Sequence, residues 1–268
     1  MLPPFVSPAW LADHRADVVL ADARTYLDGR SERAAYDAGH LPGAVFVDVH
    51  RWLAAPASPE GGRHPLPDPA VFARGMGSLG IGDDDVVVAY DDGGGVTAAR
   101  LVWMLRVTGH DAALLDGGVS GALVDTPVPD RPPAVFTPRP WPQDLLATLE
   151  DAVDPGRVLL DARDRARFRG DVEPVDPRPG HVPGARNVPC RENVGPDGAL
   201  VPAERLREVY AAVGVTDATD VVVSCGSGVT ACHDLLTMEH AGLGLGRLWP
   251  GSWSQYSADP ARPAALGD

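Results

Sequence analysis

The chain repeats itself, and this internal repeat constrains the fold more than any other feature of the sequence. Four segments of the first half recur in the second half, in the same order and at similar spacing. Chance is a weak explanation for four ordered matches, whereas duplication of a domain of about 130 residues lies near the common domain size. The matched pairs are VVLADAR (18–24) and VLLDAR (158–163), AGHLPGAVFVDV (38–49) and PGHVPGARNVPC (179–190), LGIGDDDVVVAYDDGGGVTAAR (79–100) and VGVTDATDVVVSCGSGVTAC (213–232), and LDGGVSGA (115–122) and WPGSWSQY (249–256).

A proline-rich stretch separates the two halves. Residues 125–142 hold seven prolines, and each proline restricts φ and lacks an N–H, so the stretch should be extended and poor in regular structure. We therefore expect an N-terminal domain at 1–124, a linker at 125–142 and a C-terminal domain at 143–268.

Each half alternates short apolar runs with longer amphipathic segments. The runs, rich in Val, Leu and Ala, predict buried strands, and the segments with a 3.6-residue period predict helices. This alternation indicates an α/β fold with a parallel sheet flanked by helices, in which ligands bind at the carboxyl ends of the strands. The predicted strands are 17–22, 86–90, 157–161 and 220–224, and the predicted helices are 69–79, 96–108, 203–213 and 229–241.

Charge and cysteine content narrow the classes of function. The formal net charge of −14 argues against nucleic acid and anionic membrane as partners, because both bind basic patches. No apolar run approaches the length of about 20 residues that crosses a bilayer, and the N-terminus lacks the features of a signal peptide. Three cysteines are a poor disulfide framework, which favours the reducing cytoplasm.

A cysteine stands where a predicted strand ends and a helix begins, in VVVSCGSGVTACH (221–233). Glycines let the following loop curl tightly, so that its N–H groups and those of the next helix point at one spot. The positive end of the helix dipole favours the thiolate form of a cysteine there. We therefore expect Cys225 to be a nucleophile in an anion-binding loop, whose other members are Gly226, Ser227, Gly228, Val229 and Thr230.

Other interpretations of Cys225 fit the sequence less well. The C-x6-C-H spacing of Cys225, Cys232 and His233 matches no structural zinc pattern, and no Gly-Lys-Ser/Thr follows as in a P-loop. A cysteine phosphatase requires C-x5-R, but Ala231 stands at the arginine position. A small buried hydrophobic residue is the remaining alternative. We expect neither a metal nor a cofactor.

The corresponding loop of the first half, YDDGGGVT (90–97), has no cysteine. Tyr90 or Asp92 takes the place of the cysteine, depending on which end of the loop is aligned. The carboxylates of Asp91 and Asp92 would repel an anion. The N-terminal half is therefore expected to have kept the fold and lost the chemistry.

The duplicated α/β unit, the GH-x-PGA elements and the loop CGSGVTAC together resemble the two-domain rhodanese (sulfurtransferase) family. The resemblance covers the chain from about Trp10 to Tyr256. It implies two tandem rhodanese-like domains and a sulfane sulfur carried as a persulfide on Cys225. Within the family, the loop is similar to that of 3-mercaptopyruvate sulfurtransferases, whereas thiosulfate-specific members carry basic residues after the cysteine.

The resemblance also implies a proton relay. Ser227 matches a loop serine of the family, and His64, in GGRHPLP, matches a histidine of the N-terminal domain. A hydroxyl and an imidazole can protonate the enolate that leaves when 3-mercaptopyruvate loses its sulfur. The resemblance suggests Asp48 as the carboxylate partner of His64 in this relay. Two alternatives are that His50 takes this place, or that the relay consists of His64 and Ser227 alone.

Two arginines match the substrate-binding stretch of the family. They are Arg167 and Arg178, in RFRGDVEPVDPR (167–178). The planar guanidinium fork suits a carboxylate because it binds both oxygens.

Several further residues are expected to be structural. His40 and His181 occupy equivalent places in the two halves, as do Asp22 and Asp161 at two strand ends, and a role shared with the inactive half is more simply structural. Packing roles are expected for Cys190, Cys232, Trp249 and Trp253.

The expected function is transfer of a sulfane sulfur from 3-mercaptopyruvate to a thiol, cyanide or a thioredoxin-like acceptor. The active site should lie between the domains, because Cys225 comes from one half and His64 from the other. Two alternatives stay open at this point. In the first, the main sulfur donor is thiosulfate. In the second, the protein is a persulfide carrier, which accepts sulfur without catalytic turnover.

Overall fold

The structure is a computed structural model that describes residues 1–119 and 127–268. The chain divides into two compact units. Unit 1 comprises Met1–Ala55, Pro67–Trp141 and Val194–Leu200, and unit 2 comprises Pro56–Leu66, Pro142–Asn193 and Val201–Asp268. The two units thus follow the predicted duplication, except that each takes one short segment from the other half of the sequence. No helix in the described part of the chain has the length and apolar character needed to span a membrane.

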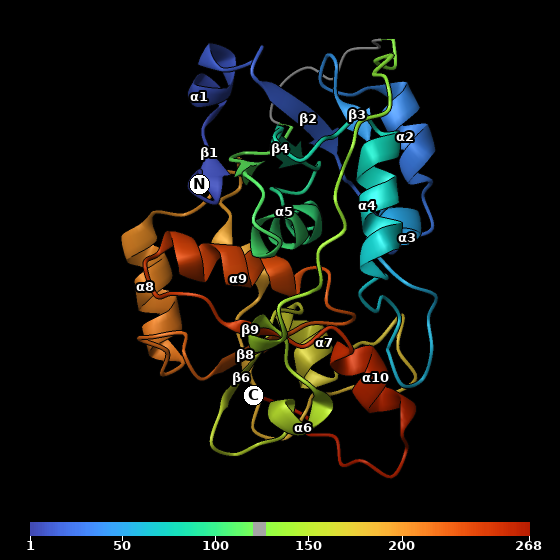
Figure 1. Cartoon of the computed structure of the whole chain (residues 1–268). Coiled ribbons are helices and arrows are strands. Elements are labelled where there is room, and N and C mark those ends of the chain that lie inside the picture. Colours follow the sequence, from blue (N-terminus) through green and yellow to red (C-terminus); the bar gives the residue numbers. More distant parts are fainter. Residues whose placement is uncertain (120–126) are drawn as a thin grey trace. The chain divides into compact units, whose positions relative to one another are not determined.

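Unit 1 contains a parallel sheet of five strands in the order β1-β5-β4-β2-β3 (Figure 1). A cluster of apolar side chains from β1, β2, β4 and β5, among them Leu20, Val88 and Leu115, forms its core. The strands are β1 (Phe5–Val6), β2 (Val18–Asp22), β3 (Val45–Phe46), β4 (Val86–Tyr90) and β5 (Ala112–Leu115), and the helices are α1 (Pro8–Asp13), α2 (Glu32–Ala38), α3 (Val49–Trp52), α4 (Pro69–Ser78) and α5 (Ala99–Val107).

Unit 2 contains a parallel sheet of four strands in the order β7-β6-β8-β9. Its core includes Leu159, Val222, Trp249 and Trp253, so the packing role expected of the two tryptophans is confirmed. The strands are β6 (Val158–Asp161), β7 (Arg186–Asn187), β8 (Val221–Ser224) and β9 (Arg247–Leu248), the helices are α6 (Leu149–Ala152), α7 (Arg165–Arg169), α8 (Ala203–Ala212), α9 (Ala231–His240) and α10 (Ser252–Ala258), and the 3-10 helices are η1 (Gln143–Leu145) and η2 (Cys190–Asn193).

The two sheets share one topology. The order β5-β4-β2-β3 in unit 1 corresponds strand by strand to β9-β8-β6-β7 in unit 2, and β1 is an addition at one edge. All four predicted strands and all four predicted helices are present, with ends that differ by at most three residues. The periodicity of apolar residues was sufficient to predict these helices and strands, because each of them buries either one face or its whole length.

Equivalent ion pairs brace the two halves. Asp22, at the end of β2, binds Arg24 through Nε at 2.8 Å, and Asp161, at the end of β6, binds Arg163 through Nη2 at 2.7 Å. Each arginine also donates to a glycine carbonyl of the GH-x-PGA element, Gly39 or Gly180. The structural role expected of both aspartates is confirmed.

The two equivalent histidines also have structural contacts. The ring of His40 stacks on Tyr36 with centroids 3.9 Å apart, and the ring of His181 stacks on Phe168 at 3.7 Å. Each Nδ1 also lies within hydrogen-bond distance of the carbonyl oxygen of the same aromatic residue.

The proline-rich segment packs along unit 1. Residues 125 and 126 lie outside the described residues, and 127–142 form no helix or strand. Ala134 donates its N–H to the carbonyl of Gly77 at 2.9 Å, and Nε1 of Trp141 donates to the carbonyl of Pro67 at 2.8 Å. The extended form expected from the prolines is therefore combined with docking on the first unit.

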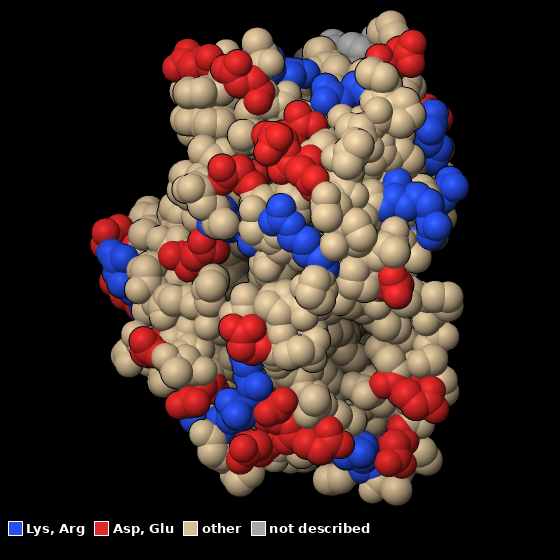
Figure 2. All heavy atoms as spheres, in the orientation of Figure 1, with Lys and Arg blue, Asp and Glu red and all other residues tan. Residues whose placement is uncertain are grey.

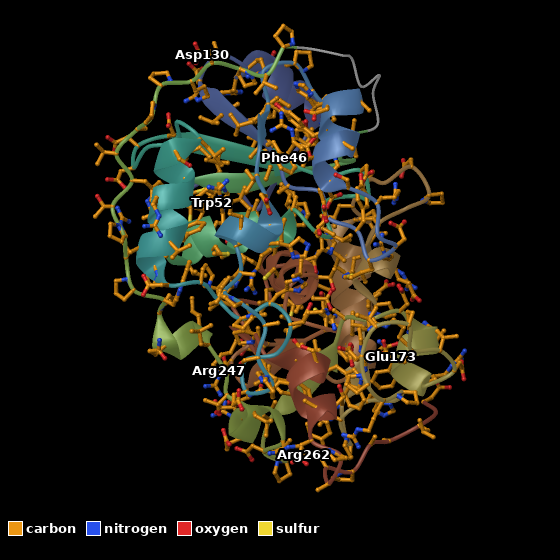
Figure 3. The ribbon with its side chains drawn as sticks, turned by 90° about the vertical axis from the view of Figure 1, so that its right-hand side faces the viewer. Phe46, Trp52, Asp130, Glu173, Arg247 and Arg262 are labelled. Atoms are coloured by element: carbon orange, nitrogen blue, oxygen red, sulfur yellow. The ribbon has the colours of Figure 1, made fainter. Side chains whose placement is uncertain are left out.

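Trp52, labelled in Figure 3, packs on Gly75 of α4 in the same unit.

Candidate active site

Cys225 lies directly after β8, an inner strand of the sheet of unit 2, and before α9. Its side chain is buried, with an exposed fraction of 2% for the residue. The N–H of Gly228 donates to Sγ of Cys225 at 3.1 Å. Gly228 has φ +75°, and a Cβ there would lie 2.7 Å from the carbonyl oxygen of Pro250. Only glycine therefore brings this N–H to the sulfur without displacing the backbone of residue 250.

Helix α10 holds the cysteine loop in place. The N–H of Cys225 donates to Oγ of Ser252 at 3.1 Å, while Trp253 and Ser254 donate their N–H groups to the carbonyls of Cys225 and Gly226. Ser252 has φ 51°, and it is the one non-glycine residue with positive φ in the part of the chain that the structure describes. Such strain is kept where the surroundings determine the conformation. The sequence analysis missed Ser252; its place in the repeated element WPGS was the available signal.

The remaining loop residues lead into α9. Val229 and Thr230 have carbonyls that accept the N–H groups of Cys232 and His233, so the loop passes directly into the first helical turn. Val229 is buried. Sγ of Cys232 donates to the carbonyl of Gly228 at 3.4 Å, and the side chain is fully buried, which fits the expected packing role.

His64 and Ser227 form a buried pair. Nδ1 of His64 and Oγ of Ser227 lie 2.7 Å apart and share one hydrogen bond. Both residues are less than a tenth exposed. A pair at this distance can move a proton between the imidazole and the hydroxyl.

The segment that carries His64 folds with unit 2. Main-chain hydrogen bonds between Ser58 and Gly62 close it into a turn, and the N–H of Arg63 donates to Oγ of Ser254 at 2.9 Å. A Cβ at Gly62 would lie 2.5 Å from the carbonyl oxygen of Gly251. The structure thus corrects the assignment of residues 56–66 to the N-terminal domain. The pair of His64 and Ser227 belongs to one compact unit, which also holds Cys225.

Asp48 lies in unit 1, where it begins a helix. Its Oδ1 accepts the N–H of Arg51 at 3.0 Å, which makes it the N-cap of α3. His50 is exposed, with Nε2 3.5 Å from Oε1 of Glu32. These contacts give Asp48 a structural role, and its support of His64 stays a prediction.

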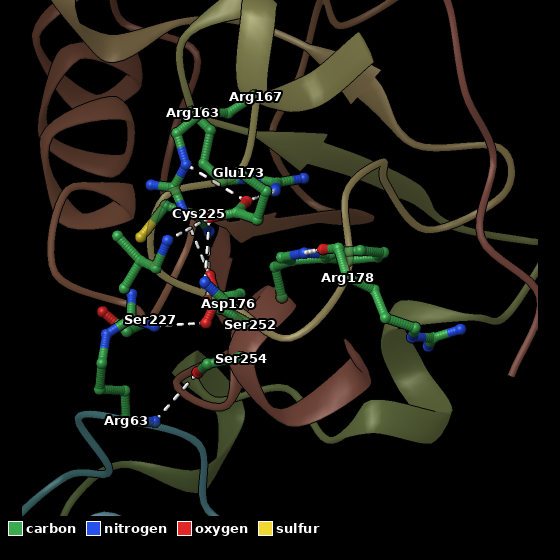
Figure 4. A network of polar contacts seen from close by, with 12 residues as sticks. Arg63, Arg163, Arg167, Glu173, Asp176, Arg178, Cys225, Ser227, Ser252 and Ser254 are labelled. Atoms are coloured by element: carbon green, nitrogen blue, oxygen red, sulfur yellow. Dashed lines mark hydrogen bonds and ion pairs between the residues drawn. The ribbon is translucent and has the colours of Figure 1, made fainter. Parts of the chain in front are cut away.

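Arg167 points toward the cysteine loop from α7. A Cβ on Gly226 would lie 3.4 Å from Nη1 of Arg167. Nη2 of the same arginine is 2.7 Å from Glu173 and 3.1 Å from Asp176. Burial opposes ionisation of Glu173, but hydrogen bonds from Arg167 and the N–H of Asp176 outweigh it and lower the pKa of this carboxyl. Arg167 therefore stands beside the cysteine loop in a network that keeps it oriented (Figure 4).

Arg178 is not placed at the cysteine loop. Its guanidinium donates to the carbonyls of Tyr256, Ser257, Asp259 and Arg262, and Figure 4 shows it directed away from Cys225. Four carbonyl acceptors leave little donor capacity for a substrate, because a guanidinium has five N–H groups. We correct the prediction of a substrate-binding role, since Arg178 secures the end of α10.

A different arginine lies at the loop. Nη2 of Arg63 would be 3.1 Å from a Cβ on Gly226, and its Nη1 forms an ion pair with Asp176. Nε of Arg63 is buried and has no hydrogen-bond partner among the described residues. The sequence analysis did not predict a role for Arg63, because the resemblance to the family assigned a function only to its neighbour His64.

Behind the loop lies a buried acid. Asp234, in the first turn of α9, is fully buried; its Oδ1 accepts Nδ2 of Asn193 at 2.8 Å, and Oδ2 has no hydrogen-bond partner among the described residues. Burial raises the pKa of Asp234 well above its usual range, and the charge of the neighbouring Cys225 adds to this. The shift favours the neutral form of this carboxyl, which does not oppose a thiolate. Burial likewise raises the pKa of Cys190, so that thiol stays protonated.

In unit 1 the corresponding loop binds its own carboxylate. Oδ1 of Asp91 accepts the N–H groups of Gly93 and Gly95 at 2.7 and 2.8 Å. Oδ2 accepts those of Thr97 and Ala98 at 2.7 and 2.9 Å, together with the Thr97 hydroxyl. The N–H groups of this loop therefore already surround a carboxylate of the chain itself, and the expectation that its acids repel another anion stays a prediction. The same strand-loop-helix element is thus an anion-binding loop in the copy without the cysteine.

We expect Asp91→Asn to lower the free energy of unfolding of unit 1 by about 3 kcal/mol, because an amide cannot accept the hydrogen bonds that Oδ2 receives. Thermal or urea unfolding measures the effect. Asp92→Asn is the matched control, since Asp92 is exposed and accepts one hydrogen bond, from Tyr26 at 2.7 Å. Equal stability of the two variants would contradict the assigned role.

Comparison with known proteins agrees with this architecture. Residues 7–123 and 142–259 each match the family model of the rhodanese-like domain. A "Probable 3-mercaptopyruvate sulfurtransferase" of Pseudomonas aeruginosa is 42% identical over 94% of this chain and 93% of its own length. The "Thiosulfate/3-mercaptopyruvate sulfurtransferase 2" of Arabidopsis thaliana is 32% identical over 97% and 86% of the two chains.

The solved structures lead to the same family. The crystal structure of SseA from Escherichia coli, which its description assigns to the 3-mercaptopyruvate sulfotransferases, superposes with a TM-score of 0.81 at 33% identity, over 94% of this chain and all of that one. With both halves matched and the two sheets sharing one strand order, the chain belongs to the rhodanese-like domain family and carries that domain twice.

Proposed function

We propose that the protein is a sulfurtransferase that moves a sulfane sulfur from 3-mercaptopyruvate to a thiol or cyanide through a persulfide on Cys225. The observation that carries this proposal is the hydrogen bond from the N–H of Gly228 to Sγ of Cys225. In the same loop, Ser227 forms a hydrogen bond with His64. An N–H aimed at sulfur supports a thiolate and, later, a persulfide.

The first half-reaction breaks one bond and forms another. The Cys225 thiolate attacks the sulfur of the donor, an S–S bond forms, and the C–S bond breaks with its electron pair left on carbon as the enolate of pyruvate. The enolate takes a proton from the hydroxyl of Ser227, which His64 replaces across the 2.7 Å hydrogen bond. The products of this step are pyruvate and the Cys225 persulfide.

The second half-reaction restores the enzyme. A thiolate, cyanide or the thiol of a thioredoxin-like protein attacks the outer sulfur, and the Cys225 thiolate leaves with the electrons of the S–S bond. All three cysteines are free, which suits a reducing cytoplasm as the place of the reaction.

Arginine holds the donor in this scheme. Arg167 contacts the cysteine loop beside Gly226 and is kept there by Glu173. Its Nε and Nη2 donate to Glu173 and Asp176, so Nη1, on the side of Gly226, is the group that donates to the carboxylate of 3-mercaptopyruvate. The chain as a whole carries a net charge of −14, and Figure 2 shows acidic and basic side chains interspersed on the face it draws. Local arginines must therefore attract the donor.

Intact-protein and peptide mass spectrometry after treatment with 3-mercaptopyruvate tests the proposal. We expect one added sulfur on the peptide that contains Cys225, with one equivalent of pyruvate released, because the half-reaction stops at the persulfide without an acceptor. Cyanide should then remove the sulfur. An added sulfur on Cys190 or Cys232 alone would contradict the scheme.

Thiosulfate is a second candidate donor, and the arginine pair beside Gly226 favours it, since thiosulfate is a doubly charged anion. Comparison of kcat/KM for the two donors decides between them. A persulfide carrier differs from both, because it would take up one sulfur and show no repeated turnover with small thiols.

A further inference from the structure

A single carboxylate joins the two arginines that flank the cysteine loop. Oδ1 of Asp176 pairs with Nη1 of Arg63, and Oδ2 lies 3.1 Å from Nη2 of Arg167 (Figure 4). The Asp176 side chain is 2% exposed. Asp176 belongs to the loop that follows α7, as does Glu173, which Figure 3 labels.

The arginine cluster is electrically balanced by its acids. Arg163 pairs with Asp161 at 2.7 Å and with Glu173 at 3.3 Å, and Arg167 pairs with Glu173 and Asp176. With the pair of Arg63 and Asp176, the network holds three guanidinium groups and three carboxylates. Asp176 is the acid shared by the two arginines that face the loop.

Those two arginines surround the position next to the nucleophile. A Cβ on Gly226 would lie 3.1 Å from Nη2 of Arg63 and 3.4 Å from Nη1 of Arg167. The Arg63 side chain is 25% exposed, so its guanidinium remains accessible to a ligand. A donor molecule bound beside Gly226 would therefore lie in the electric field of both guanidinium groups and of the carboxylate that neutralises them.

Building on the proposed function, we infer that Asp176 is a specificity-determining residue: by neutralising Arg63 and Arg167, it makes the site select a singly charged donor over a doubly charged one. 3-Mercaptopyruvate carries one negative charge, on its carboxylate, and thiosulfate carries two. The Coulomb energy of the donor with a fixed charge scales with the charge of the donor. Repulsion by the buried carboxylate therefore costs thiosulfate about twice as much as 3-mercaptopyruvate.

The test is Asp176→Asn, which keeps the size of the side chain and removes its charge. We expect the ratio of kcat/KM for thiosulfate to kcat/KM for 3-mercaptopyruvate to rise about tenfold, which corresponds to about 1.4 kcal/mol. Asp171→Asn is the matched control, because Asp171 lies in the same loop, is exposed and pairs with Arg169 rather than with Arg63 or Arg167. The control should leave the ratio unchanged. An active Asp176→Asn enzyme with an unchanged or lower ratio overturns the inference.

Arg63→Gln is the second variant, and it tests the same charge balance from the other side if Asp176→Asn fails to fold. Loss of a positive charge beside Gly226 should lower the ratio about tenfold, and an unchanged or higher ratio overturns the inference. The dissociation constants of thiosulfate and 3-mercaptopyruvate, measured with each substitution in a Cys225→Ser background, separate this outcome from failure of the proposed function. Absence of turnover with both donors in the wild type refutes the function, whereas the binding constants still report the charge selectivity.

Discussion

Replacement of Cys225 by serine is expected to abolish release of pyruvate from 3-mercaptopyruvate, with kcat lower by at least about a thousandfold. A hydroxyl at this position is not ionised at neutral pH, and oxygen cannot form the persulfide that carries the sulfur. Initial rates of pyruvate formation with cyanide or a thiol as acceptor measure the loss. The same variant should show no added sulfur by mass spectrometry after incubation with the donor.

Cys190→Ala provides the control for this experiment. Cys190 is also buried in unit 2, but burial raises the pKa of its thiol and keeps it protonated. This variant should retain pyruvate formation, with a modest loss of stability from the small cavity. Measurable multiple turnover by the Cys225→Ser enzyme would show that the sulfur takes another route, and the whole scheme would have to be abandoned.

Replacement of His64 by alanine is expected to lower kcat with 3-mercaptopyruvate by about 10²- to 10⁴-fold, the usual contribution of a general acid. The loss with thiosulfate should be far smaller, because sulfite leaves without needing a proton on carbon. Ser227→Ala should behave like His64→Ala, since the two side chains share the hydrogen bond of 2.7 Å. Steady-state rates with the two donors measure both effects.

A double-mutant cycle distinguishes a relay from two separate effects. If His64 and Ser227 pass one proton in sequence, the double variant should be scarcely slower than either single variant. His14→Ala is the matched control, because His14 lies in unit 1 at the end of α1. Equal losses of activity on the two donors in the His64→Ala enzyme would speak against proton transfer and for a purely structural contact.

Much of the fold could be predicted from short stretches of sequence. The strands that end at Asp22, Tyr90, Asp161 and Ser224 follow from runs of Val, Leu and Ala, and the helices follow from their 3.6-residue period. These signals are local, because a buried strand or an amphipathic helix displays its environment within about ten residues. The repeat then paired the elements of the two halves, and the strand order of the two sheets agrees with it.

The candidate site was predictable only in part. Cys225, with its glycines, stands where a strand meets a helix, so its place at the carboxyl end of a parallel sheet followed from the local pattern. Arg178 was misassigned because a family motif identifies the residue type but not the direction of a long side chain. Its carbonyl partners lie 78 to 84 residues further along the chain.

The sequence by itself determined the duplication, the α/β class of each half, and the strand-to-helix junction that carries the cysteine, because these depend on periodicity and turn chemistry between near neighbours. Only the tertiary structure decided that residues 56–66 fold with unit 2, that Arg63 rather than Arg178 lies beside Gly226, and that Asp91 fills the loop of the other copy. The physical reason is that hydrogen bonds and ion pairs form between groups close in space. Arg63 finds Ser254 at a separation of 191 residues and Asp176 at 113, and no local pattern records such distant partners.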